Sequence, residues 1–66
     1  MASYDIVIGN KAEGWELLKT LSDKLDALDE ADSVYEDYYQ SGWDDIEVKV
    51  VELSTKKKIK HIRPRK

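Results

Sequence analysis

Apolar and polar residues alternate near the two ends of the chain, in the pattern that is typical of strands. Residues 4–8 alternate with β-branched side chains and stop at a Gly-Asn pair, which predicts a first short strand. Residues 46–53 repeat the alternation and predict a second strand, after which residues 54–57 suit a hairpin loop. The chain is then expected to return as a third strand over residues 58–63.

Between the first two predicted strands, leucines recur at the spacing of a helix. They fall three or four residues apart and share one face, whereas Lys19, Asp23 and Asp26 populate the other. The leucines are Leu17, Leu18, Leu21, Leu25 and Leu28. Asn10 and Glu13 stand at the spacing of a capping box, in which the Asn10 side chain accepts the Glu13 backbone N–H. We therefore predict a helix from about residue 11 that packs its leucines on the sheet.

The second half of this helical segment allows two interpretations. Val34 and Tyr38 fall about 100° away from the face that carries the leucines. A break over residues 29–33 would let a second helix turn both side chains inward. An unbroken helix to about residue 40 would instead leave them exposed to a partner. In either case Gly42 suits the end of the helix, because glycine adopts the left-handed conformation that follows many helices.

These elements predict an α+β two-layer sandwich in the order β-α-(α)-β-β. One long or two short helices cover one face of a three-stranded sheet. The lysines and Pro64 suit an edge strand, so the strand over residues 58–63 is expected at the rim and that over 46–53 in the middle. Ile59 and Ile62 would point to opposite faces of a regular strand, so we expect a bulge there or a sheet that is apolar on both faces.

Length and composition limit the possibilities for domains and location. At 66 residues the chain has room for one small domain, residues 1–66, in which residues 54–66 form a basic hairpin arm and tail. It has no cysteine, so neither disulfides nor a thiolate zinc site supplement the core. No apolar run approaches the roughly 20 residues of a membrane span, and the first residues lack a secretory pattern. We expect a cytoplasmic monomer or homodimer without membrane contact.

The distribution of charge is more informative than its total. All 14 acids and four of the 11 basic residues lie in residues 1–53, and the other seven basic residues lie in residues 54–66. The first part therefore carries a net charge of −10 and the second +7. Charge segregation of this kind predicts what the protein binds rather than how it folds.

The acids in the middle of the chain are the first candidate binding surface. Residues 26–32 contain no lysine that could form a local ion pair along a helix, so mutual repulsion is not relieved there. Such a surface suits a basic groove on another macromolecule, although most charged helix faces are simply solvated. The candidate residues are Asp26, Asp29, Glu30, Asp32, Glu36, Asp37, Asp44 and Asp45.

Aromatic residues interleave with these acids. Tyr38, Tyr39 and Trp43 are candidate anchors for a protein partner, because aromatic side chains often dominate the energetics of interfaces. Aromatics at helical spacing also belong to cores. We accordingly expect Trp43, Trp15 and Tyr4 to be mainly buried.

The basic C-terminal segment is the second candidate surface. Clustered cations on a hairpin release counterions from a nucleic-acid backbone, so this segment could bind nucleic acid. It could equally protect an edge strand from aggregation or pair with the acidic helix. The candidate residues are Lys56, Lys57, Lys58, Lys60, Arg63, Arg65 and Lys66.

No catalytic or metal-binding pattern accompanies these surfaces. His61 is the single histidine, and no cysteine or positioned serine accompanies it as a nucleophile. Asp44, Asp45 and Glu47 lack the spacing of a calcium-binding loop, and the three glycines form no phosphate-binding fingerprint. We expect no enzymatic activity, no cofactor and no metal.

Together these features predict a small non-enzymatic interaction protein. Its acidic and aromatic helical surface would bind a host or partner macromolecule and occlude a basic nucleic-acid-binding site. Very small acidic domains without cysteine are common among phage-encoded regulators, and this compositional analogy suggests an inhibitor of that type or a DNA mimic. The alternative is a nucleic-acid-binding or transcription-regulatory module that uses the basic hairpin.

Overall fold

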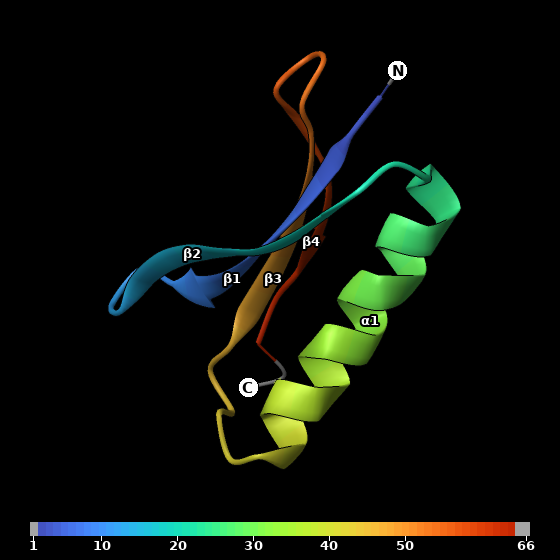
Figure 1. Cartoon of the computed structure of the whole chain (residues 1–66). Coiled ribbons are helices and arrows are strands. Elements are labelled where there is room, and N and C mark those ends of the chain that lie inside the picture. The colour runs from blue at the N-terminus through green and yellow to red at the C-terminus, as the bar shows by residue number, and fades with distance from the viewer. Residues whose placement is uncertain (1, 65–66) are drawn as a thin grey trace.

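The protein is a four-stranded antiparallel sheet with one helix, shown in Figure 1 as a computed structural model in which residues 2–64 are described. The elements follow in the order β1 (Tyr4–Asn10), β2 (Gly14–Leu21), α1 (Lys24–Gln40), β3 (Glu47–Glu52) and β4 (Lys57–Ile62). The strands lie side by side as β2-β1-β3-β4, so the two hairpins meet at the central pair β1 and β3.

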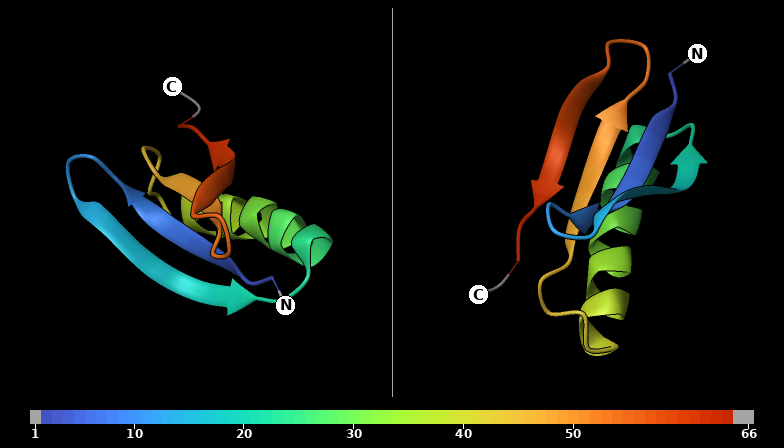
Figure 2. Two further views of the ribbon diagram at one scale, coloured as in Figure 1. Left: turned by 90° about the horizontal axis from the view of Figure 1, so that it is seen from above. Right: turned by 90° about the vertical axis from the view of Figure 1, so that its left-hand side faces the viewer.

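Helix α1 covers one face of this sheet and leaves the other uncovered (Figure 2). The predicted α+β two-layer sandwich is therefore confirmed, with four strands in place of three. The strand over residues 46–53 lies in the middle beside the first strand, and the lysine-rich strand lies at the rim, both as predicted. Among the described residues, no helix is long and apolar enough to cross a membrane.

The prediction of a helix from residue 11 is wrong, because residues 14–21 form strand β2. The Glu13 backbone N–H does donate to the Asn10 Oδ1, at 2.8 Å, but this bond closes a hairpin turn rather than a helix. Gly14 follows the turn with φ +88°, a conformation that glycine adopts without strain. The three turn residues, 11–13, and this glycine after them return the chain antiparallel to β1.

Asp23 is the N-cap of helix α1, and its side chain accepts the Asp26 backbone N–H at 3.1 Å. The helix continues to Gln40 without a break, which is the second of the two interpretations that the sequence allows. Its end is a Schellman motif, in which the Gly42 N–H donates to the Tyr39 carbonyl and the Trp43 N–H to the Tyr38 carbonyl, each at 3.1 Å. Gly42 has φ +106°, so the predicted glycine terminus is confirmed.

The face of α1 that packs on the sheet differs from the predicted one. Its buried residues are Ala27, Ala31, Val34 and Tyr35. Val34 is thus buried, contrary to the exposure expected for an unbroken helix. Leu25 is 72% exposed, whereas Leu18 and Leu21 pack against the core from β2, so the prediction of one helical stripe of core leucines is wrong. The leucine spacing crosses the boundary between a strand and a helix and therefore describes neither.

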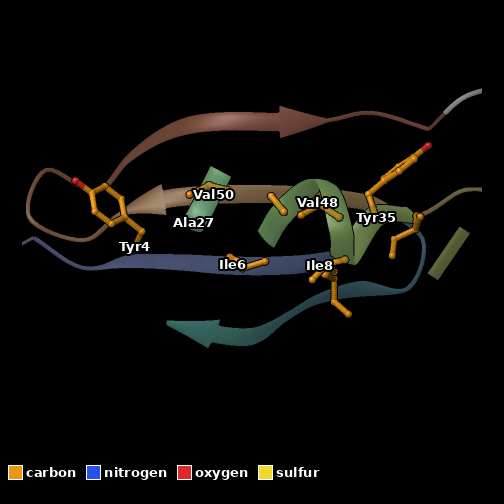
Figure 3. Packing of buried hydrophobic residues seen from close by; sticks show 10 residues of the cluster. Tyr4, Ile6, Ile8, Ala27, Tyr35, Val48 and Val50 are labelled. Atoms are coloured by element: carbon orange, nitrogen blue, oxygen red, sulfur yellow. The ribbon is translucent and has the colours of Figure 1, made fainter. Parts of the chain in front are cut away.

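The core lies between the two alanines of α1 and the central strands (Figure 3). Ile6, Val48 and Val50 point toward the helix from β1 and β3, and each is fully buried. Because alanine side chains are short, the helix backbone can approach these β-branched residues closely. Tyr4 is also buried, as predicted, at the start of β1. This burial raises the pKa of the Tyr4 phenol, and the neighbouring Glu52 carboxylate raises it further.

The C-terminal hairpin agrees with the sequence in detail. Residues 53–56 form the turn between β3 and β4. The pairing of Val51 with Lys58 and of Val50 with Lys60 leaves Ile59 as an extra residue, which is the predicted bulge. The bulge lets both Ile59 and Ile62 pack against the core.

Candidate interaction surfaces

The outward side of α1 carries the first candidate surface. Its exposed acids are Asp26, Asp29, Asp32 and Asp37, which we call the acidic face. Lys24 is the helix's single basic residue, and none stands in the last turn. Asp37 lies near the C-terminus, where the helix dipole is itself negative, so its charge costs stability rather than adding it.

Two predicted binding acids are instead engaged in the fold. Lys19 of β2 forms an ion pair with Glu30. Lys60 of β4 forms another with Asp32, in which Nζ lies 3.0 Å from Oδ1. These pairs connect α1 to both edges of the sheet. Asp26, Asp29 and Asp37 have no ion pair within residues 2–64.

The remaining predicted acids have different surroundings. Glu36 is half-buried on α1, whereas Asp44 and Asp45 are exposed in the loop before β3. The Asp45 backbone carbonyl accepts a long hydrogen bond, 3.4 Å, from the side chain of buried Asn10. That loop thereby contacts the turn of the β1–β2 hairpin.

The predicted aromatic anchors are half-buried and pack against the core. Tyr38 and Trp43 meet edge to face with ring centroids 5.8 Å apart, and Tyr39 stacks on Tyr35 at 6.0 Å. Tyr38 and Trp43 are the two positions between which a Schellman motif often makes an apolar contact. This pair therefore has a structural role at the end of α1, and partner binding by these aromatics stays a prediction.

The basic candidates divide into three groups. Lys56, Lys57 and Lys58 are exposed at the β3–β4 turn, and Arg63 is exposed just after β4. Lys60 is half-buried and paired with Asp32, so part of the basic arm does pair with the acidic helix. Arg65 and Lys66 lie outside the described residues.

A further surface, the uncovered face of the sheet, was missed in the sequence interpretation. Ile6, Val48 and Val50 face α1, so their neighbours in β1 and β3 face away from it. Strand pairing arranges this open face in three rows, namely Thr20, Asp5, Val51 and Lys58; Leu17, Val7, Lys49 and His61; and Trp15, Gly9 and Glu47. The two views of Figure 2 show that the tip of the β1–β2 hairpin bends away from α1, toward the open side.

Trp15 connects the strands of the open face. It is 36% exposed, so the expectation that it is mainly buried is wrong. The Lys49 Nζ lies 3.7 Å from the centroid of its ring, and the His61 ring meets it edge-on at 6.3 Å. Gly9, which faces Trp15 across the strand pair, has no side chain to occupy the space between them. The alternation of Trp15 and Leu17 in the sequence could have revealed this strand, had Gly14 been taken as a turn residue.

His61 is held on both sides of its ring. Its Nε2 lies 2.7 Å from Glu47 Oε1, and its Nδ1 lies 3.2 Å from the Lys58 Nζ. The lysine can only donate, so in this arrangement Nδ1 accepts and Nε2–H donates to the carboxylate. His61 thus organises β3 and β4 on the open face. Among the described residues, no three His, Asp or Glu side chains gather closely enough to hold a metal ion.

Comparison with protein-family models, with curated proteins and with solved structures finds no match to the chain. Any assignment of function therefore depends on the geometry of the surfaces above.

Proposed function

We propose that this protein is a non-enzymatic interaction protein whose acidic face binds a basic surface on a partner macromolecule. The observation that carries the proposal is the set of carboxylates Asp26, Asp29 and Asp37, which are exposed and have no ion pair within residues 2–64. Their mutual repulsion destabilises the helix that holds them. Lysines or arginines of a partner would relieve this repulsion, and the electrostatic free energy released would favour the complex.

Leu25 adds an apolar contact to this surface. It is 72% exposed and precedes Asp29 by one helical turn, so both side chains lie on the outward side of α1. An exposed apolar side chain bordered by carboxylates suits a partner with an apolar spot inside a basic rim. The acids would then accelerate encounter, and Leu25 would prolong the complex.

In this proposal the protein acts by occlusion in the cytoplasm. A helix with carboxylates along its outer side presents negative charge to a groove that otherwise accepts phosphates. It would thereby compete with nucleic acid for that groove, as expected of an inhibitor or regulator of a nucleic-acid-binding protein.

The test compares the binding of three forms of the protein. Immobilised wild-type protein, an Asp26→Asn/Asp29→Asn variant and a Glu13→Gln/Glu16→Gln variant are exposed to the same cell lysate at several salt concentrations. The last two variants change the net charge equally, but Glu13 and Glu16 lie in the β1–β2 hairpin, away from the acidic face. We expect a basic protein that the wild-type and the hairpin variant retain and that the helix variant loses.

Surface plasmon resonance with the captured protein then measures the rate constants. The helix variant should associate more slowly and with a weaker dependence on salt, whereas Leu25→Ala should mainly accelerate dissociation. Equal capture by all three forms would contradict the proposal, as would equal association rates for the helix and hairpin variants.

The second candidate function is nucleic-acid binding through the β3–β4 hairpin. It is favoured by one observation, the exposure of three consecutive lysines at the turn, Lys56, Lys57 and Lys58. The acidic face lies on the helix side of the sheet, so its repulsion of phosphates is weaker at this turn. Replacement of the three lysines by glutamine should reduce affinity for DNA and RNA and lower the salt slope by about 2. Fluorescence anisotropy at low salt measures these affinities, and absence of binding would reject nucleic-acid binding by this hairpin.

A further inference from the structure

The open face of the sheet combines an exposed aromatic ring with cations. Trp15 lies at one side of this face, and Lys49 and His61 lie beside it on β3 and β4. Lys58 follows on the neighbouring row of β4. The β3–β4 turn adds Lys56 and Lys57 at the end of the same two strands.

The position of Trp15 makes its ring a surface on which a planar group can stack. Lys49 lies over the ring at 3.7 Å, so the protein's own cation covers that side of the indole. Trp15 is 36% exposed, and this remaining surface is available for contact with an external group. Every nucleobase has a flat π surface that stacks on such a ring, and stacking tolerates differences of sequence.

The carboxylates of the open face are already engaged within the protein. The Glu47 carboxylate accepts a hydrogen bond from His61 at 2.7 Å, and its side chain is 17% exposed. The Asp5 carboxylate accepts one from the Thr20 hydroxyl at 2.6 Å. Lys49 and Lys58, by contrast, form no ion pair with a described carboxylate. Asp5 and Glu47 keep their negative charge, so the cations available to a phosphate are Lys49 and Lys58 together with the lysines of the turn.

This composition argues against a second copy of the chain as the occupant. Packing two open faces together would remove Lys49, Lys58, Asp5 and Glu47 from water on both copies. The desolvation of these charged groups would oppose the gain from a few apolar side chains. A strand of nucleic acid keeps its phosphates beside the lysines and needs only its bases to be desolvated.

We infer that the open face binds single-stranded nucleic acid, with a base stacked on Trp15, a neighbouring phosphate near Lys49, and the phosphates further along the nucleic-acid strand near Lys58 and the β3–β4 turn. This inference rests on the second candidate function and specifies its site and its substrate class. A base inside a duplex has no free π surface to offer. The site should therefore select single strands over duplexes, a preference that the turn lysines alone would not produce.

The test follows the indole signals of the ¹⁵N-labelled wild-type protein by NMR. The protein has two tryptophans, so Trp43, which lies at the end of α1, is an internal control. The probes are a thymidine oligonucleotide of about 12 nucleotides and its duplex with the complementary strand. We expect the single strand to shift the Trp15 indole signal and leave that of Trp43 unchanged, and the duplex to affect Trp15 much less.

Anisotropy with the same probes compares Trp15→Leu with Trp15→Phe. Both substitutions keep an apolar side chain, but only phenylalanine keeps a ring. We expect the leucine variant to weaken single-strand binding roughly 5- to 150-fold and the phenylalanine variant to retain most of the affinity. Ser33→Ala, which changes an exposed side chain on α1, should leave the affinity unchanged.

The outcomes separate this site from the candidate function on which it rests. Nucleic-acid binding could depend on the three turn lysines and yet leave the Trp15 signal unchanged, or it could be equally tight for duplex and single strand. Either result overturns the Trp15 site but preserves nucleic-acid binding by the β3–β4 hairpin. Absence of binding to either probe rejects both. A Trp15 signal that moves with protein concentration alone would assign the open face to a second copy and overturn the inference.

Discussion

Gly9 and Gly14 approach so closely that a Cβ on Gly9 would lie 2.0 Å from the Gly14 carbonyl oxygen. Gly9 also has φ +142°, which residues with side chains rarely adopt. The same Cβ would lie 3.0 Å from the Trp15 Cα, so a side chain at Gly9 would disturb the strand pairing that holds Trp15.

Substitution Gly9→Ala should therefore destabilise the protein by at least about 2 kcal/mol, because conformational strain and a clash with the backbone add together. Gly14→Ala is the matched control in the same hairpin. It has φ +88° but no atom within 4 Å of the added Cβ, so it should cost only about 1 kcal/mol. Urea denaturation of both variants measures the difference, and equal losses would show that the clash is relieved by movement.

The close approach of α1 to the sheet should make its alanines sensitive to added volume. Ala31 is fully buried against the central strands, and Ala31→Leu should cost about 1 to 3 kcal/mol through overpacking. Leu25→Ala removes more atoms but from a side chain that is 72% exposed, so we expect a change within about 0.5 kcal/mol. Chemical denaturation measures both changes. A larger loss of stability for Leu25→Ala than for Ala31→Leu would indicate that Leu25 belongs to the core.

The edge-to-face contact of Tyr38 and Trp43 should contribute to the end of α1. A double-mutant cycle with Tyr38→Leu and Trp43→Leu should give a coupling free energy of about 0.5 to 1.5 kcal/mol. The same cycle between Tyr38 and Trp15 is the control, because Trp15 lies on the opposite side of the sheet. Its coupling should be close to zero, and a coupling equal to that of the first pair would contradict a local contact.

The Tyr4 phenol should make stability depend on pH in the alkaline range. Its pKa in the folded protein is raised above the ordinary value of 10.0, so the unfolded chain releases this proton first as pH rises. The stability associated with the neutral phenol is complete below pH 10.0 and is lost as pH rises through the folded pKa. Tyr4→Phe removes this dependence. The free energy of unfolding of wild-type protein should thus fall relative to that of the variant above pH 10.0, and a constant difference would count against the shift.

The sequence predicts the C-terminal half of the fold well because its periodicity is strict. Val48 and Val50 alternate with polar residues, and the odd spacing of Ile59 and Ile62 predicts the observed bulge as one of two alternatives. Prediction failed between residues 11 and 23, where the apolar spacing of β2 resembles a helix. The Asn10 hydrogen bond to Glu13 was anticipated, but the same local bond serves either a helix cap or a hairpin turn. Only pairing with β1 decides between them, and that contact is tertiary.

The candidate surfaces, like the fold, could be predicted from the sequence only in part. The outward position of Asp26 and Asp29 could be anticipated, because charged residues without partners stay in solvent. The open face could not, since it joins residues from all four strands and depends on the order of the strands in space. Trp15 and His61 are 46 positions apart in the chain, and no sequence spacing links them.

The order β2-β1-β3-β4 also shapes how the chain can fold. Each outer strand belongs to a tight hairpin, so two of the three strand pairings close loops of a few residues and can form within microseconds. The central pairing, in which Gly9 meets Glu47, joins residues far apart in sequence and must wait for a large loop to close. Folding should be limited by this one closure, which α1 shortens when it forms. Substitutions that weaken the early hairpins, or the central pair through Ile6 or Val48, should therefore slow folding more than they accelerate unfolding.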